Sequence, residues 1–329
     1  MRVLFIGSKS YDYMQDIVYS GLVKILGLKN VIELNWNKKY HIPHKKYPKN
    51  LGYVENSILA SIHLIKRNFN LVIVAATKPD CFEAYLQIAA DIPAGVPVVL
   101  IDGGDRPELG GDLDRLGRPE LLNKAQAIRD FDLIFKREYK IGSTYAPNVW
   151  PLTFGFNLAR LPKKLSMIRK YDVAFWAGES HEIRTKALNL LAGQFDCDSN
   201  GTSRGVSLSS FNRKGSFYLE ELSTCKINLS LRGGGFDTLR YWEIPAVGSM
   251  LLSEPADIVI EDDFVNEKSA VFCDPSLDDM LDLCKYYLKE DNKRERIAKN
   301  GENHLREYHT DVKRAGSILE QINNLAFKF

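Results

Sequence analysis

The sequence predicts an α/β protein made of two doubly wound, Rossmann-like domains that face a cleft. Short apolar runs, each suited to a buried parallel strand, alternate with amphipathic helical stretches, as in a sheet with right-handed crossovers. The alternation breaks at the Pro- and Gly-containing stretch Asn148–Asn157 and restarts at Asp172. A chain of 329 residues is also longer than one compact core usually serves. We therefore expect domains at residues 1–154 and 155–310, with a last helix at 311–329 that can pack back on the first domain.

The expected elements follow one another in strand–helix order. In the first half, apolar runs predict strands at Val3–Gly7, Val31–Trp36, Leu71–Ala76, Pro97–Ile101 and Asp132–Phe135. Apolar residues at helical spacing predict helices at Asp16–Leu28, Val54–Arg67 and Pro79–Ala90. In the second half we expect strands at Asp172–Ala177, Lys226–Leu231 and Ser249–Ser253, and helices from Ile183, Thr238, Ser276, Arg294 and Val312.

Composition limits the classes of function. The net charge of +2 gives no general case for binding nucleic acid, so none is expected. The five cysteines include no Cys-x-x-Cys pair and indicate reduced, mostly buried thiols. Met1-Arg2 leads directly into a strand, which leaves no room for a signal peptide, and no apolar run approaches the ~20 residues of a membrane span. We therefore expect a cytoplasmic protein.

The stretch Cys225–Pro255 carries the strongest functional signal. Its first strand ends at Leu231 and is followed by Arg232 and three glycines, Gly233, Gly234 and Gly235. The backbone of such a turn can approach a ligand closely because no side chain intervenes. A helix begins shortly afterwards. Strand, glycine turn and helix N-terminus together form a site for phosphate, because unpaired N–H groups and the helix dipole both favour an anion.

Arg240 and Glu243 lie on one face of that helix, three residues apart. An arginine can bond a diphosphate through two N–H groups, and a carboxylate can accept from both hydroxyls of a ribose. An ordinary surface ion pair between the two residues is the alternative. The order Arg240, Glu243, Ala246, Gly248 and an apolar strand resembles the nucleotide-sugar site of GT-B glycosyltransferases, in particular the spore-maturation-protein branch and, more distantly, the exostosin-like branch.

Two further stretches are similar to the same branch. One is D-V-A-F-W-A-G at Asp172–Gly178 with Arg184 on the next helix, and the other is Phe264–Leu319. The resemblance thus covers about Asp172–Leu319, and the first half only through its fold pattern. It implies a nucleotide-sugar donor held without a metal or another cofactor, which agrees with the lack of a His/Cys cluster of ligand spacing in the second half. The implied diphosphate contacts are Arg184, Arg232, Arg240 and the amides of Gly233, Gly234 and Gly235, and the implied ribose contact is Glu243.

One departure from the family pattern leaves the stereochemistry open. Retaining GT-B families often carry two glutamates separated by seven residues, and the second is the ribose glutamate. Gly235 stands where the first would be, and Asp237 is a nearby carboxylate that can compensate. An inverting enzyme also needs a general base. Asp102 and Asp105 are the best-placed candidates, since active sites of α/β folds gather at the carboxyl ends of strands, and a plain Asp-Gly-Gly-Asp turn is the alternative.

The leading hypothesis is a glycosyltransferase that passes a sugar to an unidentified acceptor, with Arg240 stabilising the departing diphosphate. The alternatives are a nucleotide-sugar epimerase of the same fold and a non-catalytic nucleotide- or sugar-binding protein. The segment between Trp36 and Leu51 is rich in lysine, lacks periodicity and is expected to be a loop. A solvated basic loop is its first interpretation. Contact with an anionic or membrane-associated acceptor, such as a phospholipid carrier, is the second.

Overall fold

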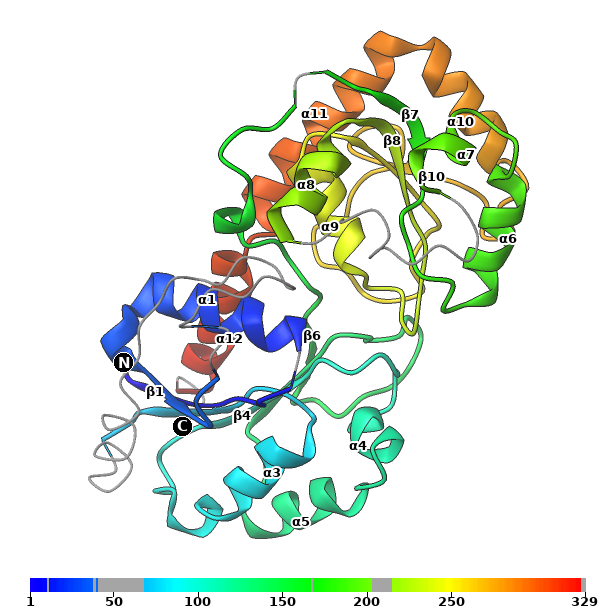
Figure 1. The fold of residues 1–329 in the computed structure, drawn as a ribbon. Helices are drawn as coiled ribbons and strands as arrows, with labels where there is room; N and C mark the ends of the chain where they lie inside the picture. The colour runs from blue at the N-terminus through cyan, green and yellow to red at the C-terminus, as the bar shows by residue number, and fades with distance from the viewer. Residues whose placement is uncertain (11, 38–39, 41–67, 167, 203–214, 327–329) are drawn as a thin grey trace.

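The computed structural model describes residues 1–10, 12–37, 40, 68–166, 168–202 and 215–326, and it contains two parallel sheets, one in each half of the chain (Figure 1). We call the six-stranded sheet with its helices the N-terminal lobe and the four-stranded sheet with its helices the C-terminal lobe. The predicted α/β fold class with parallel sheets is therefore confirmed. The predicted helix Val54–Arg67 and most of the lysine-rich segment lie outside the described residues.

The N-terminal lobe has the strand order β2-β1-β3-β4-β5-β6, with every neighbouring pair parallel. Its strands are β1 (Val3–Ile6), β2 (Val31–Leu34), β3 (Leu71–Val74), β4 (Val98–Asp102), β5 (Leu133–Lys136) and β6 (Val149–Pro151). Its helices are α1 (Tyr13–Leu26), α3 (Pro79–Leu86), α4 (Gly111–Arg115) and α5 (Glu120–Ile128). Short 3-10 turns lie at Leu28–Asn30 and Ala89–Asp91.

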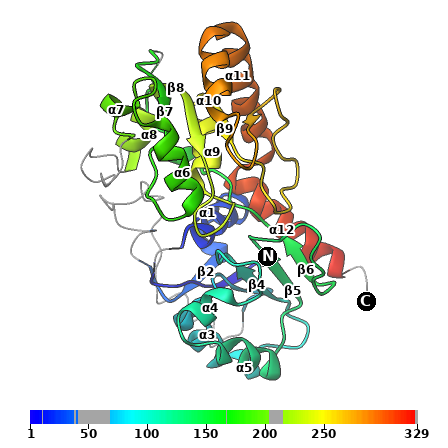
Figure 2. The same cartoon turned by 90° about the vertical axis from the view of Figure 1, so that its right-hand side faces the viewer.

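Helices cover both faces of this sheet because both faces are apolar. Val3 and Phe5 of β1 pack in one core cluster with residues of α1, whereas Leu4 and Ile6 pack in a second with residues of α3 and α5. Successive side chains of a strand point to opposite faces, so a run of four apolar residues needs cover on both. In Figure 2, α3, α4 and α5 lie below the sheet and α1 lies above it, toward the other lobe.

The C-terminal lobe has the strand order β10-β9-β8-β7, again all parallel. Its strands are β7 (Tyr171–Ala174), β8 (Cys225–Ser230), β9 (Met250–Ser253) and β10 (Val271–Phe272). Its helices are α6 (Glu182–Leu191), α7 (Cys197–Asn200), α8 (Gly215–Ser223), α9 (Leu239–Ala246), α10 (Met280–Lys289) and α11 (Asp291–Tyr308).

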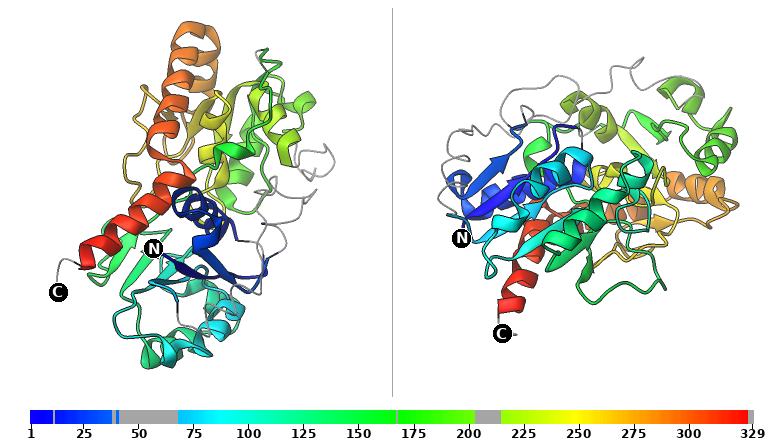
Figure 3. Two further views of the ribbon diagram at one scale, coloured as in Figure 1. Left: turned by 90° about the vertical axis from the view of Figure 1, so that its left-hand side faces the viewer. Right: turned by 90° about the horizontal axis from the view of Figure 1, so that it is seen from below.

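The last helix, α12 (Asp311–Ala326), returns to the N-terminal lobe and lies against α1 (Figure 3). The contact is close because α1 has a glycine at its centre: a Cβ built on Gly21 would lie 2.1 Å from the carbonyl oxygen of Asp311. The carboxylate of Asp311 accepts from Ser20 Oγ and from Lys24 Nζ, each at 2.6 Å. The chain therefore crosses between the lobes twice. The domain boundaries at residues 154 and 310 stay a prediction.

The sequence did not predict the strand β6, nor did it predict the strand β10 or the helices α4, α5, α7 and α8. Val149–Pro151 lies in the stretch that we interpreted as a break, because Pro and Gly interrupt its apolar pattern. Three residues with a proline are compatible with a strand only at the edge of a sheet, where one backbone side needs no partner. β6 is the edge strand beside β5.

Candidate functional site

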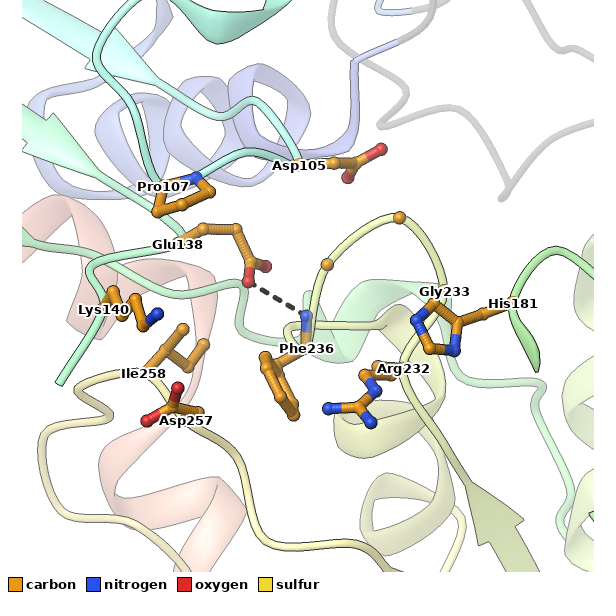
Figure 4. A pocket seen from close by; sticks show the side chains of 12 residues that line it. Asp105, Pro107, Glu138, Lys140, His181, Arg232, Gly233, Phe236, Asp257 and Ile258 are labelled. Atoms are coloured by element: carbon orange, nitrogen blue, oxygen red, sulfur yellow. Dashed lines mark hydrogen bonds between the residues drawn. The ribbon is translucent and has the colours of Figure 1, made fainter. Parts of the chain in front are cut away.

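A pocket of about 240 Å³ lies between the two lobes (Figure 4). The N-terminal lobe contributes Asp105 and Pro107, which follow β4, and Glu138 and Lys140, which follow β5. The C-terminal lobe contributes Arg232–Phe236 after β8, Asp257 and Ile258 after β9, and His181 immediately before α6. Ligands of parallel α/β sheets bind beyond the carboxyl ends of the strands, and here the carboxyl ends of both sheets meet at one pocket. It is therefore the candidate active site.

Backbone pairing fixes one wall of the pocket. The N–H of Val259 donates to the carbonyl of Tyr139 at 2.8 Å, and the N–H of Ile141 donates to the carbonyl of Asp257 at 3.3 Å. The segments that follow β5 and β9 thus form a short antiparallel bridge at Lys140 and Ile258. This bridge holds the two lobes together beside the site.

The glycine loop, Arg232 to Gly235, lies so close to its neighbours that each glycine is required. A Cβ built on Gly233 would lie 2.8 Å from an Arg184 nitrogen, and one on Gly234 would lie 2.6 Å from Asp105 Oδ2. A Cβ on Gly235 would lie 2.4 Å from Glu138 Oε1. Contacts below 3.0 Å force a neighbour to move. In the structure the backbone of this turn lies close to side chains of the protein, and its predicted close approach to a ligand stays a prediction.

Glu138 is the pocket residue that sequence reasoning missed. Its carboxylate comes from the N-terminal lobe and accepts from two successive amides of the C-terminal lobe, Phe236 N at 2.9 Å and Asp237 N at 3.0 Å. Burial raises the pKa of Glu138, against the opposing effects of Arg137 and of these amides. The same rule that selected Asp102 and Asp105, a carboxylate just past the end of a buried strand, also applies to Glu138 after β5.

The two predicted aspartates occupy different environments. Asp105 lines the pocket, its side chain is 53% exposed, and it pairs with the guanidinium of Arg137. Asp102 is fully buried, lies 3.1 Å from Lys136 Nζ, and accepts from the amides of Gly104 and Gly110. It does not line the pocket. These bonds are the ones expected if the Asp-Gly-Gly-Asp stretch serves only as a turn.

Asp237 forms hydrogen bonds within the protein through both of its carboxylate oxygens. Its carboxylate accepts from Phe154 N at 2.5 Å and from Trp242 Nε1 at 2.7 Å. Burial raises its pKa to about 7, although Arg137 acts in the opposite direction. Because both oxygens are bonded inside the protein, Asp237 is not available to replace a glutamate at position 235.

Two of the predicted arginines differ in accessibility: Arg184 is buried, and Arg232 is partly exposed. Arg184 donates to the carbonyls of Gly178, Leu231 and Arg232 at 2.8–3.2 Å, and burial lowers its pKa to about 10. It holds the loop in place. Arg232 lines the pocket, with its side chain 29% exposed and its guanidinium 4.8 Å from the centre of the Phe236 ring. Its nearest carboxylate is that of Glu254, 3.5 Å from Nε.

Arg240 and Glu243 do not pair with each other in the described residues. Arg240 donates from Nη1 to the carbonyl of Trp176 at 3.2 Å. Glu243 is buried and accepts from Arg160 Nη2 at 2.6 Å through Oε1. Arg160, just past the first crossing between the lobes, was not foreseen as its partner. Neither Arg240 nor Glu243 lines the pocket, and both lie on the helix that follows its glycine loop.

The described residues show no candidate metal site. The described residues contain no group of three or more His, Cys, Asp and Glu side chains arranged to hold a metal. An Asp-x-Asp triplet is present at Asp196–Asp198, but the carboxylate of Asp196 accepts from the amides of Asp172 and Val173. All five cysteines are buried and free.

Comparisons with known proteins agree with this architecture. Residues 198–320 match the sequence model of the family described as glycosyl transferase-like. An alpha-glucosyltransferase in complex with UDP-glucose and DNA containing an abasic site has a similar structure, with a TM-score of 0.63, 12% identity and coverage of 98% of this chain and 99% of that chain. HepE from Anabaena in complex with UDP-glucose has a TM-score of 0.63 and 11% identity, with coverage of 98% of this chain and 100% of that chain. Sucrose-phosphate synthase from Thermosynechococcus elongatus has a TM-score of 0.61 and 10% identity, with coverage of 100% of both chains.

The chain has the GT-B fold of these glycosyltransferases. The family match covers residues 198–320, which include the glycine loop, Arg240 and Glu243 but not β7 or α6, and the fold match covers the whole chain. Membership of the spore-maturation-protein branch stays a prediction. No curated protein matches the chain in sequence. Among its described helices, none combines the length and the apolar character that a membrane crossing needs.

Proposed function

We propose that this protein is a glycosyltransferase that binds a nucleoside-diphosphate sugar in the pocket between the lobes and passes the sugar to a hydroxyl of an acceptor without a metal. The observation that carries the proposal is the position of the glycine loop. It lines the pocket and leads directly into the N-terminus of α9. Backbone N–H groups and the helix dipole favour an anion at such a place.

The diphosphate would bind to Arg232 and to the loop amides. The Arg232 side chain reaches the pocket, and its ion pair with Glu254 is long, so it can turn to a phosphate. Within the described residues nothing accepts from the amides of Gly234 and Gly235. Arg240, which donates to the carbonyl of Trp176, would neutralise the charge that grows on the diphosphate as the bond to the sugar breaks. Glu243 would accept from the ribose.

Asp105 is the stronger of the two candidates for a general base. As the new glycosidic bond forms, the acceptor hydroxyl loses its proton, and a carboxylate within reach can take it. Asp105 is exposed in the pocket and close to the glycine loop, whereas Asp102 is buried in its turn.

Uridine diphosphate is the first nucleotide to test. Structures of similar fold contain UDP or UDP-glucose, which supports this choice without fixing the base for this protein. One of those structures also contains DNA, which is a feature of that complex. The net charge of +2 gives no reason to expect that the present protein binds DNA. The lysine-rich segment between Trp36 and Leu51 supports an anionic or membrane-associated acceptor as the second proposal.

Calorimetric titration with UDP, ADP, GDP and dTDP, each with and without EDTA, tests the donor site. We expect one diphosphate to bind equally well with the chelator. Arg232→Ala should weaken it about ten- to hundredfold, because hydrogen bonds to charged groups are worth about 1.5–3 kcal/mol. The matched control is Arg296→Ala, which removes an exposed arginine from α11 and should leave affinity unchanged. Absence of binding by all four nucleotides would contradict the proposal.

A further inference from the structure

The carboxylate of Glu138 occupies the space that a side chain at residue 235 would fill. A Cβ built on Gly235 would lie 2.4 Å from both Cδ and Oε1 of Glu138. Gly235 does not have a left-handed φ, so its backbone would accept an L residue. The three heavy atoms nearest to such a Cβ all belong to Glu138. Position 235 is also where many retaining families of this fold carry the first of their two glutamates.

Glu138 has acceptor capacity left over for a ligand. A carboxylate offers about four lone-pair sites. The amides of Phe236 and Asp237 use one on each oxygen, and Arg137 Nη2 lies 3.6 Å from Oε1, beyond hydrogen-bond distance. Figure 4 shows the carboxyl group at the pocket, next to the loop. A carboxylate that accepts hydrogen bonds and is fixed in a pocket suits a ligand that donates several hydrogen bonds, as the hydroxyls of a sugar do.

We propose that Glu138 binds hydroxyls of the transferred sugar, so that the N-terminal lobe supplies the carboxylate that the glycine loop lacks. This inference rests on the proposed function. It makes Glu138 a specificity-determining residue for the sugar and not for the nucleotide. It also explains the pairing of residues 138 and 235: one carboxylate is needed at this point, and there is room for only one.

The first experiment separates sugar from nucleotide. Affinities for UDP and for UDP-glucose are measured by calorimetry on the full-length wild type and on Glu138→Ala. We expect the variant to bind UDP-glucose about ten- to hundredfold more weakly, as for the loss of a charge-assisted hydrogen bond, and to bind UDP within about threefold of wild type. If Glu138 only ties the lobes and the loop together, its loss changes both affinities by the same factor, and the proposal is wrong.

The second experiment moves the carboxylate to the other lobe. Gly235→Glu alone should abolish binding of UDP-glucose, since its side chain collides with Glu138. The double variant Glu138→Ala with Gly235→Glu should recover UDP-glucose affinity to within about tenfold of wild type and exceed both single variants. Such non-additivity is expected for two residues that share one space. A structural tie between the lobes is not restored by this exchange, because the new side chain and the loop belong to the same lobe.

The outcomes distinguish this inference from the proposal beneath it. If neither UDP nor UDP-glucose binds the wild type, nor any diphosphate of the panel, both proposals fall. If the nucleotides bind and the double variant is no better than the single variants, the donor site stands and the role of Glu138 is refuted. Thermal unfolding of each variant shows whether a lost affinity reflects a lost fold.

Discussion

Arg240 is the second residue of α9. It donates to the carbonyl of Trp176, and its Nε is buried without a hydrogen-bond partner among the described residues. A buried donor without a partner is costly, and such groups call for a ligand or another explanation. Because Arg240 lies near the N-terminus of the helix that follows the glycine loop, we propose a departing diphosphate as its partner.

Arg240→Lys should separate binding from turnover. Lysine keeps the charge but loses the planar fork, so UDP should bind nearly as in the wild type. If Arg240 stabilises charge that develops only in the transition state, release of UDP from UDP-glucose should slow about 10²- to 10³-fold. The assay can use water as the acceptor. An unchanged rate would show that Arg240 is not part of the catalytic machinery, and equal loss of binding and rate would assign it to the ground state alone.

His309 is a buried histidine whose protonation state the geometry fixes. Its Nε2–H donates to the carbonyl of Asp262 at 2.8 Å, and its Nδ1 accepts from Arg314 at 2.9 Å. The ring is therefore neutral. Burial lowers the pKa of His309 to about 2, with further lowering from the charges of Arg314 and His304.

Stability should fall in acid because of this residue. The unfolded chain takes up a proton on His309 below pH ~6.5, whereas the folded chain does not until about pH 2. Its contribution is thus complete above pH ~6.5 and is lost as the pH falls, by up to about 1.4 kcal/mol per pH unit. Asp237, with its pKa raised to about 7, acts in the opposite direction, so the wild-type curve alone is not decisive.

The test compares wild type with His309→Asn, in which the amide oxygen can still accept from Arg314. Free energies of unfolding are measured in urea between pH 7.5 and 5. Over this range the wild type should lose roughly 2 kcal/mol more than the variant, from about 1.5 pH units below pH 6.5 at the slope of one proton. Parallel curves would mean that His309 has a normal pKa in the folded protein.

Two helical glycines show how the same residue type acts differently in different elements. Gly21 of α1 faces α12 so closely that a Cβ would lie 2.1 Å from Asp311 O and 2.7 Å from the Ala315 Cβ. Gly316 of α12 has no heavy atom within 4 Å of a built Cβ. The first glycine permits a helix contact, and the second has only the conformational cost of glycine in a helix.

Gly21→Ala and Gly316→Ala should therefore have effects of opposite sign. The first substitution pushes α12 from α1 and should destabilise the enzyme by about 1–3 kcal/mol, the usual cost of overpacking. The second should stabilise it by about 0.5–1 kcal/mol. Chemical denaturation of both variants checks this, and each serves as the control for the other. If Gly21→Ala does not destabilise the protein, α12 does not pack on α1 as described.

Elements with a local sequence pattern were predictable, and those that depend on distant partners were not. β1, β3 and β8 are apolar or alternating runs with their signal inside four to six residues. The glycine loop is likewise local. β6 was missed because its three residues are strand only through their pairing with β5.

The candidate site shows the same division at the scale of the whole molecule. Arg232 and the glycines could be selected from one stretch of sequence. Glu138 contacts Phe236 at a sequence separation of 98 residues, and Arg160 contacts Glu243 at a separation of 83 residues. Such pairs exist only after the lobes have packed together. The sequence pattern identifies the loop but carries no information on what lies opposite it.

The two crossings between the lobes are joined by one side chain. Arg314 of α12 donates to the carbonyls of Thr153 and Phe154 on the first crossing, and to His309 on the second. Phe156 N also donates to His309 O at 2.8 Å. A rotation of one lobe against the other is therefore anchored at this cluster as well as at the backbone bridge beside the pocket.

The return of α12 also has a consequence for the order of events during synthesis. All strands of the N-terminal sheet have been made by Pro151, yet the face of α1 around Gly21 stays bare until Asp311–Ala326 has been added. The described elements of the C-terminal lobe, β7 to α11, all precede α12 in the chain, so this lobe can close first. The half of the protein that is translated first is therefore the half that is completed last, and during that interval its uncovered helix is the surface that a chaperone would bind.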